Sequence, residues 1–114
     1  MAATGITIST HVLDTSIGAP AAGITVHLEG VNDAVIASAD TDTDGRVAVF
    51  ANTADRLTAG KYRLCFDVAP YFARMSVKSF YNEICIAFEV GDGPQHYHVP
   101  LLLSPFGYST YRGS

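Results

Sequence analysis

The side chains of this 114-residue chain that could perform chemistry are His11, Arg46 and His98. A histidine exchanges protons near neutral pH because its ordinary pKa is about 6.5. Arginine is a permanent cation that can hold negative charge developing on a carbonyl oxygen. An imidazole that takes a proton from water, together with a guanidinium that stabilises an attacked carbonyl, is sufficient for hydrolysis.

Two other interpretations of these residues stay open at this point. A single histidine on a polar strand face is most often a solvated residue, and Arg46 directly follows a turn at Asp44-Gly45. The spacing His96-x-His98 also matches two metal ligands on one strand face, with His11 as a third. A zinc site is disfavoured because, apart from Asp14, no Cys, Asp or Glu lies close in sequence to these histidines.

Nucleophilic catalysis is disfavoured by the sequence. Gly-x-Ser-x-Gly is absent, and an all-β chain has no place for the strand-to-helix elbow of that motif. Cys65 and Cys85 lie in strand-like runs and form no Cys-x-x-Cys arrangement. We expect buried or half-buried free thiols, with a single disulfide as the less favoured alternative.

A period of two residues dominates the chain wherever a period can be recognised. Apolar residues alternate with polar or small ones, as half-buried antiparallel strands require, over residues 24–29, 62–68 and 84–90. Residues 6–11 and 35–39 are further strand candidates. Turn residues separate the runs at the spacing of an all-β domain, which predicts seven or eight strands.

One short helix and a β-sandwich complete the predicted fold. Residues 70–75 can form a helix that has Pro70 at its first position, where its missing N–H does no harm. Two sheets can bury the Ile, Val, Leu and Phe faces against each other. In the strand from His96, alternation puts Leu101 and Leu103 in the core and the histidines on the outer face, which a partner subunit would have to cover.

The bulk composition limits the partners. A chain with 48% hydrophobic and 16% charged residues can build one core, so we expect a single domain over residues 1–114. The net charge of −4 and the scattered Lys and Arg residues give no basic field, which disfavours nucleic acid and membrane surfaces as partners. The first residues lack a basic region and an apolar stretch, so we expect a cytoplasmic protein.

Three blocks that include the candidate residues resemble a known family. They are His11-Val12-Leu13-Asp14-Thr15-Ser16 with Gly18, Pro20 and Ala21; Thr43-Asp44-Gly45-Arg46; and the end from His96 through Tyr111-Arg112-Gly113-Ser114. In these blocks the chain resembles the 5-hydroxyisourate hydrolases, transthyretin-related enzymes of urate breakdown. The terminal Tyr-Arg-Gly-Ser is the most specific part, because hormone-carrying transthyretins lack it.

The resemblance implies an all-β, transthyretin-like sandwich of two four-stranded sheets that assembles as a homotetramer, a dimer of dimers. It implies a substrate pocket at the dimer–dimer interface and hydrolysis of the lactam bond of 5-hydroxyisourate to 2-oxo-4-hydroxy-4-carboxy-5-ureidoimidazoline. The competing class is a transthyretin-like carrier that binds a small hydrophobic ligand in the tetramer channel. Histidine, arginine and tyrosine in the pocket favour reaction over transport.

Residue roles follow from the resemblance block by block. His11 and His98 would position and deprotonate the water, with His98 favoured as the base, and Arg46 would bind and polarise the substrate's carbonyl system. Tyr111, Arg112, Gly113 and Ser114 would bind substrate and shape the pocket. Neither a metal nor another cofactor is required.

Overall fold

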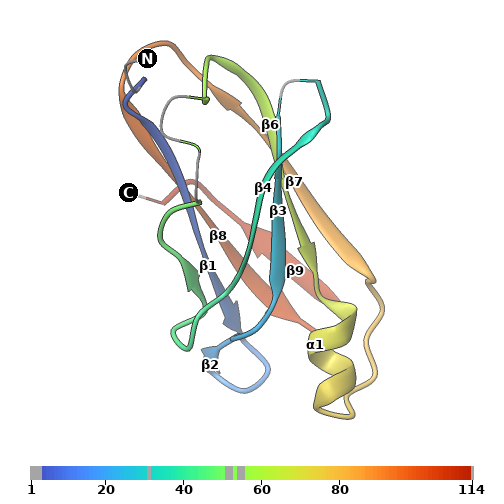
Figure 1. Cartoon of the computed structure of the whole chain (residues 1–114). Helices are drawn as coiled ribbons and strands as arrows, with labels where there is room; N and C mark the ends of the chain where they lie inside the picture. The colour runs from blue at the N-terminus through green and yellow to red at the C-terminus, as the bar shows by residue number, and fades with distance from the viewer. Residues whose placement is uncertain (1–3, 31, 51–52, 54–55, 114) are drawn as a thin grey trace.

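Two β-sheets pack face to face and enclose the core of the protein, as the computed structural model shows (Figure 1). The structure describes residues 4–30, 32–50, 53 and 56–113. The first sheet has the order β2-β1-β8-β9, with β5 also paired to β1, and the second has the order β4-β3-β6-β7. A short helix, α1, follows β6.

The elements fall close to the predicted runs. The first sheet contains β1 (Ile6–Asp14), β2 (Ala19–Pro20), β5 (Arg46–Val47), β8 (Gln95–Ser104) and β9 (Gly107–Thr110). The second contains β3 (Thr25–Glu29), β4 (Val35–Asp40), β6 (Gly60–Asp67) and β7 (Glu83–Val90), and α1 spans Ala69–Arg74. The all-β sandwich with one short helix is confirmed. The first sheet has five segments rather than four because two-residue strands, β2 and β5, pair with β1.

The core is built from the alternating apolar faces of both sheets. Val26, Leu28 and Leu64 of the second sheet are fully buried, as are Leu101 and Leu103 of β8. On the opposite face of β8, His96 is exposed and His98 is half-buried. The predicted orientation of β8 is therefore confirmed.

Strands β1 and β8 pair in parallel, a pairing that the period of the sequence does not reveal. Every residue of β1 has a partner in β8, from Ile6 opposite Gln95 to Asp14 opposite Leu103. Parallel neighbours need a long connection. Here that connection contains the whole second sheet, so residues far apart in sequence share one face.

The expectation of free thiols is wrong, because Cys65 and Cys85 form a disulfide in the structure. The register of β6 and β7 places the two residues directly opposite each other, with Cα atoms 4.1 Å apart. Alternation indicated that each cysteine lies in a strand. It did not indicate which strand residues face each other.

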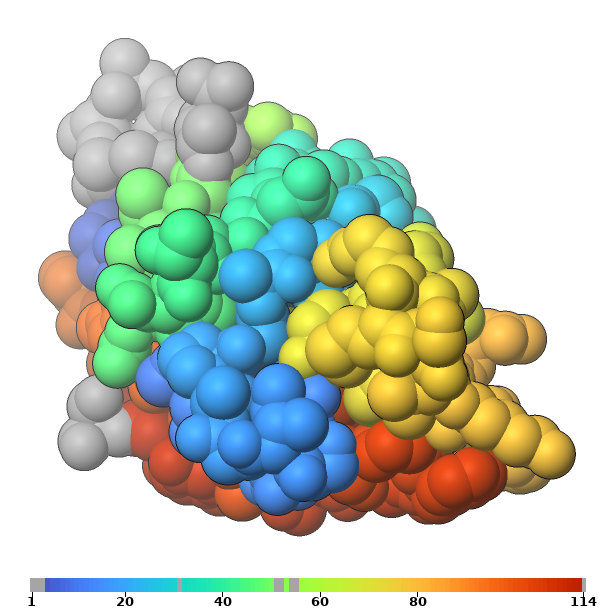
Figure 2. Space-filling view, turned by 90° about the horizontal axis from the view of Figure 1, so that it is seen from below, coloured from blue at the N-terminus to red at the C-terminus, as the bar shows by residue number. Residues whose placement is uncertain are grey.

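A buried carboxylate joins the end of β1 to α1. Asp14 is fully buried and accepts hydrogen bonds from the Tyr71 hydroxyl, at 2.8 Å, and from the Ser16 hydroxyl and backbone N–H. Burial, followed by this bond to Asp14, raises the pKa of Tyr71. Figure 2 shows this end of the molecule, where α1 (yellow) lies beside the segment that follows β1 (blue). Asp14 therefore has a structural role.

In the described part of the chain, no helix has the length and apolar character needed to span a bilayer.

Replacing Tyr71 by phenylalanine should destabilise the fold without changing it. The variant leaves a buried carboxylate with one donor fewer, which should cost about 1–3 kcal/mol in the free energy of unfolding. Urea denaturation monitored by circular dichroism measures this, with Tyr108→Phe as the control at a more exposed tyrosine. Equal midpoints for the two variants would show that the Asp14 bond contributes nothing.

Candidate active site

The pairing of β1 with β8 gathers polar side chains on the outer face of the first sheet. Ser9 lies opposite His98, and Thr7 lies opposite His96. The Ser9 hydroxyl is 2.7 Å from Nδ1 of His98 and 2.8 Å from Nε2 of His96. The Thr7 hydroxyl is 2.6 Å from Nδ1 of His96. These contacts form a continuous hydrogen-bonded chain from Thr7 to His98.

The Ser9 hydroxyl couples the two imidazoles. A hydroxyl carries one proton, so it donates to one ring nitrogen and accepts from the other. Ser9 is itself buried, which fixes the position of its hydroxyl between the rings. Nε2 of His98 makes no hydrogen bond to another of the described residues.

Arg46 reaches the same face from the other edge of β1. Strand β5 pairs antiparallel with β1, and this register places Arg46 directly opposite His11. The turn before Arg46 is held by Asp42, whose carboxylate accepts bonds from the N–H groups of Asp44 and Arg46, both at 2.9 Å. The structure therefore places Arg46 and His11 side by side on the sheet face that carries His98, although His11 is not among the residues that line the cleft shared by Arg46 and His98.

A glycine allows β5 to approach β1 this closely. Gly45 has φ of +74°, and its carbonyl accepts a bond of 2.7 Å from the Val12 N–H. A Cβ atom there would lie 2.3 Å from the Val12 carbonyl oxygen, a distance that no side chain tolerates. Gly45 is thus required for the placement of Arg46.

The histidine cleft is the cavity of about 280 Å³ lined by Ser9, Thr10, Arg46, Ala48, His96 and His98. Burial, the largest cause, and then the nearby charges of His96, Arg46 and His11 lower the pKa of His98. Both effects disfavour the imidazolium form. Both therefore favour the neutral imidazole, the form that can accept a proton.

The C-terminal segment contacts the cleft through Gly113. Its N–H donates to the His98 carbonyl at 2.8 Å. A Cβ atom on Gly113 would lie 2.6 Å from Cδ2 of His98, so the glycine backbone packs directly on the imidazole. This contact gives the terminal glycine a role in fixing the ring.

Tyr111 and Arg112 lie elsewhere within this single chain. They line a second cavity, of about 150 Å³, together with Ile86, Phe88, Glu89, Tyr97, Val99 and Thr110. The Arg112 guanidinium lies 4.7 Å from the centroid of the Tyr97 ring. Ser114, the last predicted substrate-binding residue, falls outside the described residues.

The metal interpretation of the histidines gains no geometric support. Among the residues that the structure describes, one group of three or more His, Cys, Asp and Glu side chains brings its ligand atoms within 4.8 Å of one another, and it is Cys65, Glu83 and Cys85. His11, His96 and His98 form no such group. His96 instead binds the Thr7 and Ser9 hydroxyls through both ring nitrogens.

Sequence reasoning did not assign roles to Thr7 and Ser9. The strand pattern places both on the face of His11. Their contact with His96 and His98 depends on the parallel register, which nothing in the local sequence specifies.

The chain belongs to the HIUase/Transthyretin family, whose model matches residues 8–113. It is 44% identical to a 5-hydroxyisourate hydrolase of Halalkalibacterium halodurans, covering 94% of this chain and 97% of that protein. It is 45% identical to the uric acid degradation bifunctional protein TTL of Arabidopsis thaliana, but the match spans only 37% of that longer protein.

Solved structures agree with the fold. The structure of Klebsiella pneumoniae 5-hydroxyisourate hydrolase matches with a TM-score of 0.84 and 41% identity, covering 95% of this chain and 93% of that one. Sea bream transthyretin in complex with thyroxine matches with a TM-score of 0.82 and 26% identity, covering 93% of each chain. A 5-hydroxyisourate hydrolase and a thyroxine-bound transthyretin share this fold, so the site residues must distinguish their functions.

Replacing Arg46 by glutamine should raise the pKa of His98. The guanidinium disfavours a second positive charge nearby, and its removal makes imidazolium easier to form. The His98 ring signals in NMR spectra recorded against pH should then titrate at higher pH than in the wild type. Lys61→Gln, which removes a cation from the second sheet, is the control and should leave the His98 titration in place. An equal His98 pKa in both variants would contradict the electrostatic coupling.

Replacing Gly113 by alanine should displace the His98 ring. The added methyl group would overlap Cδ2, while Gly107→Ala, the control in the same terminal segment, meets no atom closer than 3.7 Å. The His98 ring resonances should shift in the first variant alone. Because Gly113 lies near the end of the chain, the midpoint of urea unfolding of the Gly113→Ala variant should stay near that of the wild type. Unshifted resonances would show that the ring does not depend on Gly113.

Proposed function

We propose that this chain is a 5-hydroxyisourate hydrolase that opens the lactam ring of its substrate with an activated water. The observation that carries the proposal is a half-buried His98, whose lowered pKa favours the neutral imidazole, beside the cationic Arg46 on one polar cleft. Relatives that bear this enzyme's name, at 42–44% identity over nearly their full length, support it.

In the proposed mechanism, Nε2 of His98 takes a proton from water as the water oxygen attacks the lactam carbonyl carbon. Ser9 holds the other nitrogen of the ring and fixes its orientation. Arg46 stabilises the negative charge on the carbonyl oxygen, and His11, opposite it, positions the water. As the carbon–nitrogen bond breaks, the imidazolium returns the proton to the leaving nitrogen, which yields 2-oxo-4-hydroxy-4-carboxy-5-ureidoimidazoline.

The alternative function is that of a transthyretin-like carrier. A carrier channel would be lined by apolar and small side chains. The lining of the histidine cleft, with Ser9, Thr10, Arg46, His96 and His98, is mostly polar and favours hydrolysis.

We further propose that the working form is a homotetramer, a dimer of dimers, in the cytoplasm. The histidine cleft lies on the outer face of its sheet, and Tyr111 is more than half exposed in the single chain. A second subunit that covers this face would exclude water and bring terminal residues, including Tyr111, Arg112 and Ser114, against the substrate. The chemistry uses no cofactor.

The direct test generates 5-hydroxyisourate in place from urate with urate oxidase and follows its decay by absorbance. The proposal predicts faster decay in proportion to the concentration of this protein. An unchanged decay rate, together with tight binding of a hydrophobic ligand such as thyroxine, would support the carrier instead.

The variants His98→Ala, His11→Ala and Arg46→Ala should each lower turnover by about a hundredfold or more, the usual scale for a proton-transfer or oxyanion-stabilising group. Circular dichroism should show an unchanged fold, since these side chains lie outside the core of the chain, and light scattering checks that the variants keep the wild-type assembly. His27→Ala, a histidine of the second sheet, serves as the control. Wild-type rates in the three site variants would refute the assignment.

A further inference from the structure

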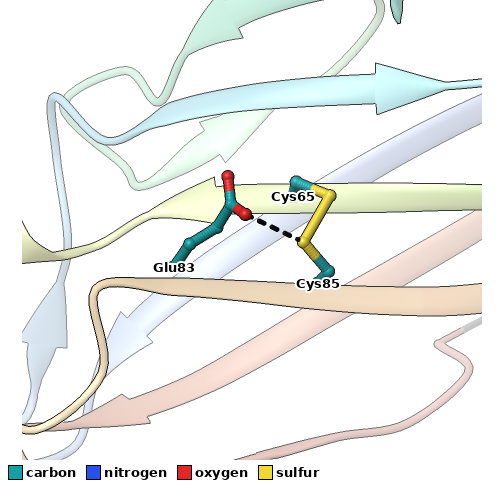
Figure 3. Close-up of side chains that lie close together, drawn as sticks. All are labelled: Cys65, Glu83 and Cys85. Atoms are coloured by element: carbon teal, nitrogen blue, oxygen red, sulfur yellow. Dashed lines mark hydrogen bonds between the residues drawn. A yellow bond between two sulfur atoms is a disulfide. The ribbon is translucent and has the colours of Figure 1, made fainter. Parts of the chain in front are cut away.

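We propose that Cys65, Cys85 and Glu83 form, when the disulfide is reduced, a binding site for a thiophilic divalent cation of the zinc class (Figure 3). The site lies on the second sheet, separate from the histidine cleft on the first. It is independent of the proposed hydrolase activity.

The two strands bring the three donors together by register. Cys65 of β6 is directly opposite Cys85 of β7, and Glu83 precedes Cys85 by two residues on the same face. Their ligand atoms lie within 4.8 Å of one another. Cys65 is buried whereas Cys85 and Glu83 are exposed, so an ion can enter from solvent.

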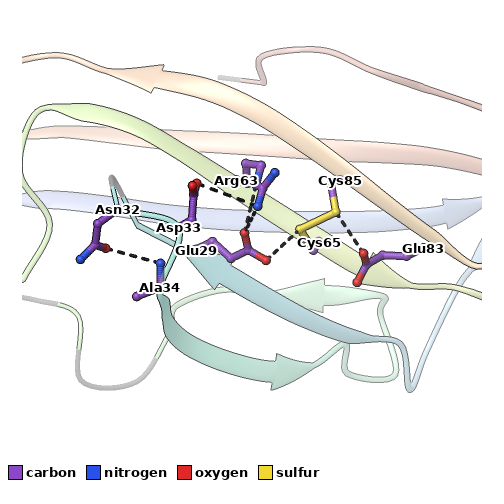
Figure 4. Close-up of polar contacts among 8 residues, drawn as sticks. All are labelled: Glu29, Asn32, Asp33, Ala34, Arg63, Cys65, Glu83 and Cys85. Atoms are coloured by element: carbon purple, nitrogen blue, oxygen red, sulfur yellow. Dashed lines mark hydrogen bonds and ion pairs between the residues drawn. A yellow bond between two sulfur atoms is a disulfide. The ribbon is translucent and has the colours of Figure 1, made fainter.

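Carboxylate oxygens face both sulfur atoms. Sγ of Cys85 is 3.4 Å from Oε1 of Glu83, and Sγ of Cys65 is 3.4 Å from Oε2 of Glu29 (Figure 4). A disulfide sulfur has no proton to donate, and neither has a carboxylate. The carboxylate oxygens gain a partner when the reduced cysteines donate their thiol protons to them. They also gain one when a cation takes the place of the two thiol protons.

The two glutamates have different surroundings. Glu29 is paired with Arg63, whose Nε lies 3.0 Å from its Oε1, so its charge is already compensated. Glu83 makes no such pair within the described residues, and Asp67 of β6 lies directly opposite it. Facing like charges are destabilising. A bound cation would relieve this repulsion, which makes Glu83 the expected ligand.

The donor set selects the ion. Two thiolates and one carboxylate suit Zn²⁺ or Cd²⁺, whereas Mg²⁺ and Ca²⁺ require oxygen ligands. Three protein ligands leave one tetrahedral position for water.

The oxidation state of the cysteines controls the site. An external dithiol supplies two electrons and two protons, cleaves the Cys65–Cys85 bond to two thiols and itself becomes a disulfide. Binding of the cation then releases the two thiol protons to solvent. With the disulfide closed, neither sulfur is available as a thiolate ligand.

The test titrates the reduced full chain with Co²⁺ without oxygen, after the dithiol has been removed, and then displaces Co²⁺ with Zn²⁺. We expect one Co²⁺ per chain, with the visible bands of a tetrahedral ion and a thiolate charge-transfer band. The oxidised protein should show neither feature. Glu83→Gln should weaken Zn²⁺ binding by about tenfold to a hundredfold or more, because even indirect partners of metal ligands have effects of that size.

The matched control is Glu89→Gln, which removes a carboxylate from the same face of β7. It should bind Zn²⁺ like the wild type. Equal affinities for Glu83→Gln and Glu89→Gln would overturn the assignment of Glu83. Unchanged binding in a Cys65→Ser/Cys85→Ser variant, or no thiolate band in the reduced wild type, would overturn the site.

Discussion

The parallel pairing of β1 with β8 is the constraint on which the rest of the structure depends. Ile8 and Val12 of β1, with Leu101 and Leu103 of β8, are buried on the inner face. Because side chains alternate along a strand, a slip of one residue would turn these groups toward solvent and the polar ones toward the core. The packing of the core therefore also fixes the outer face. It sets Ser9 against His98 and, through β5, Arg46 against His11.

Two glycines let backbone segments pack closely against this outer face. Gly45 lets β5 lie against β1, and Gly113 packs on the His98 ring. Together with the buried Ser9 hydroxyl, they hold a half-buried imidazole whose pKa is lowered by burial and by the nearby histidines and Arg46. A proton acceptor, a cation and an open cleft on a rigid sheet are what hydrolysis of a cyclic amide requires.

The sequence predicted the faces of the strands better than their partners. Alternation correctly placed Leu101 and Leu103 in the core and His98 outside, because that pattern is local. It did not reveal the Cys65–Cys85 disulfide or the hydrogen bond between Ser9 and His98. Both depend on how strands pair, and the paired residues lie 20 positions apart in the first case and 89 in the second. The resemblance assigns the whole terminal motif to one pocket, yet within the single chain Gly113 contacts His98 while Tyr111 and Arg112 line another cavity.

The central claim is that His98 and Arg46 act on one substrate as a unit. A double-mutant cycle on the hydrolysis of 5-hydroxyisourate, with uncatalysed decay subtracted, measures this most directly. The account predicts that His98→Ala/Arg46→Ala loses little more activity than the worse of the single variants, because groups that act together are strongly non-additive. Losses that multiply, so that the double variant falls by the product of the two single effects, would contradict it.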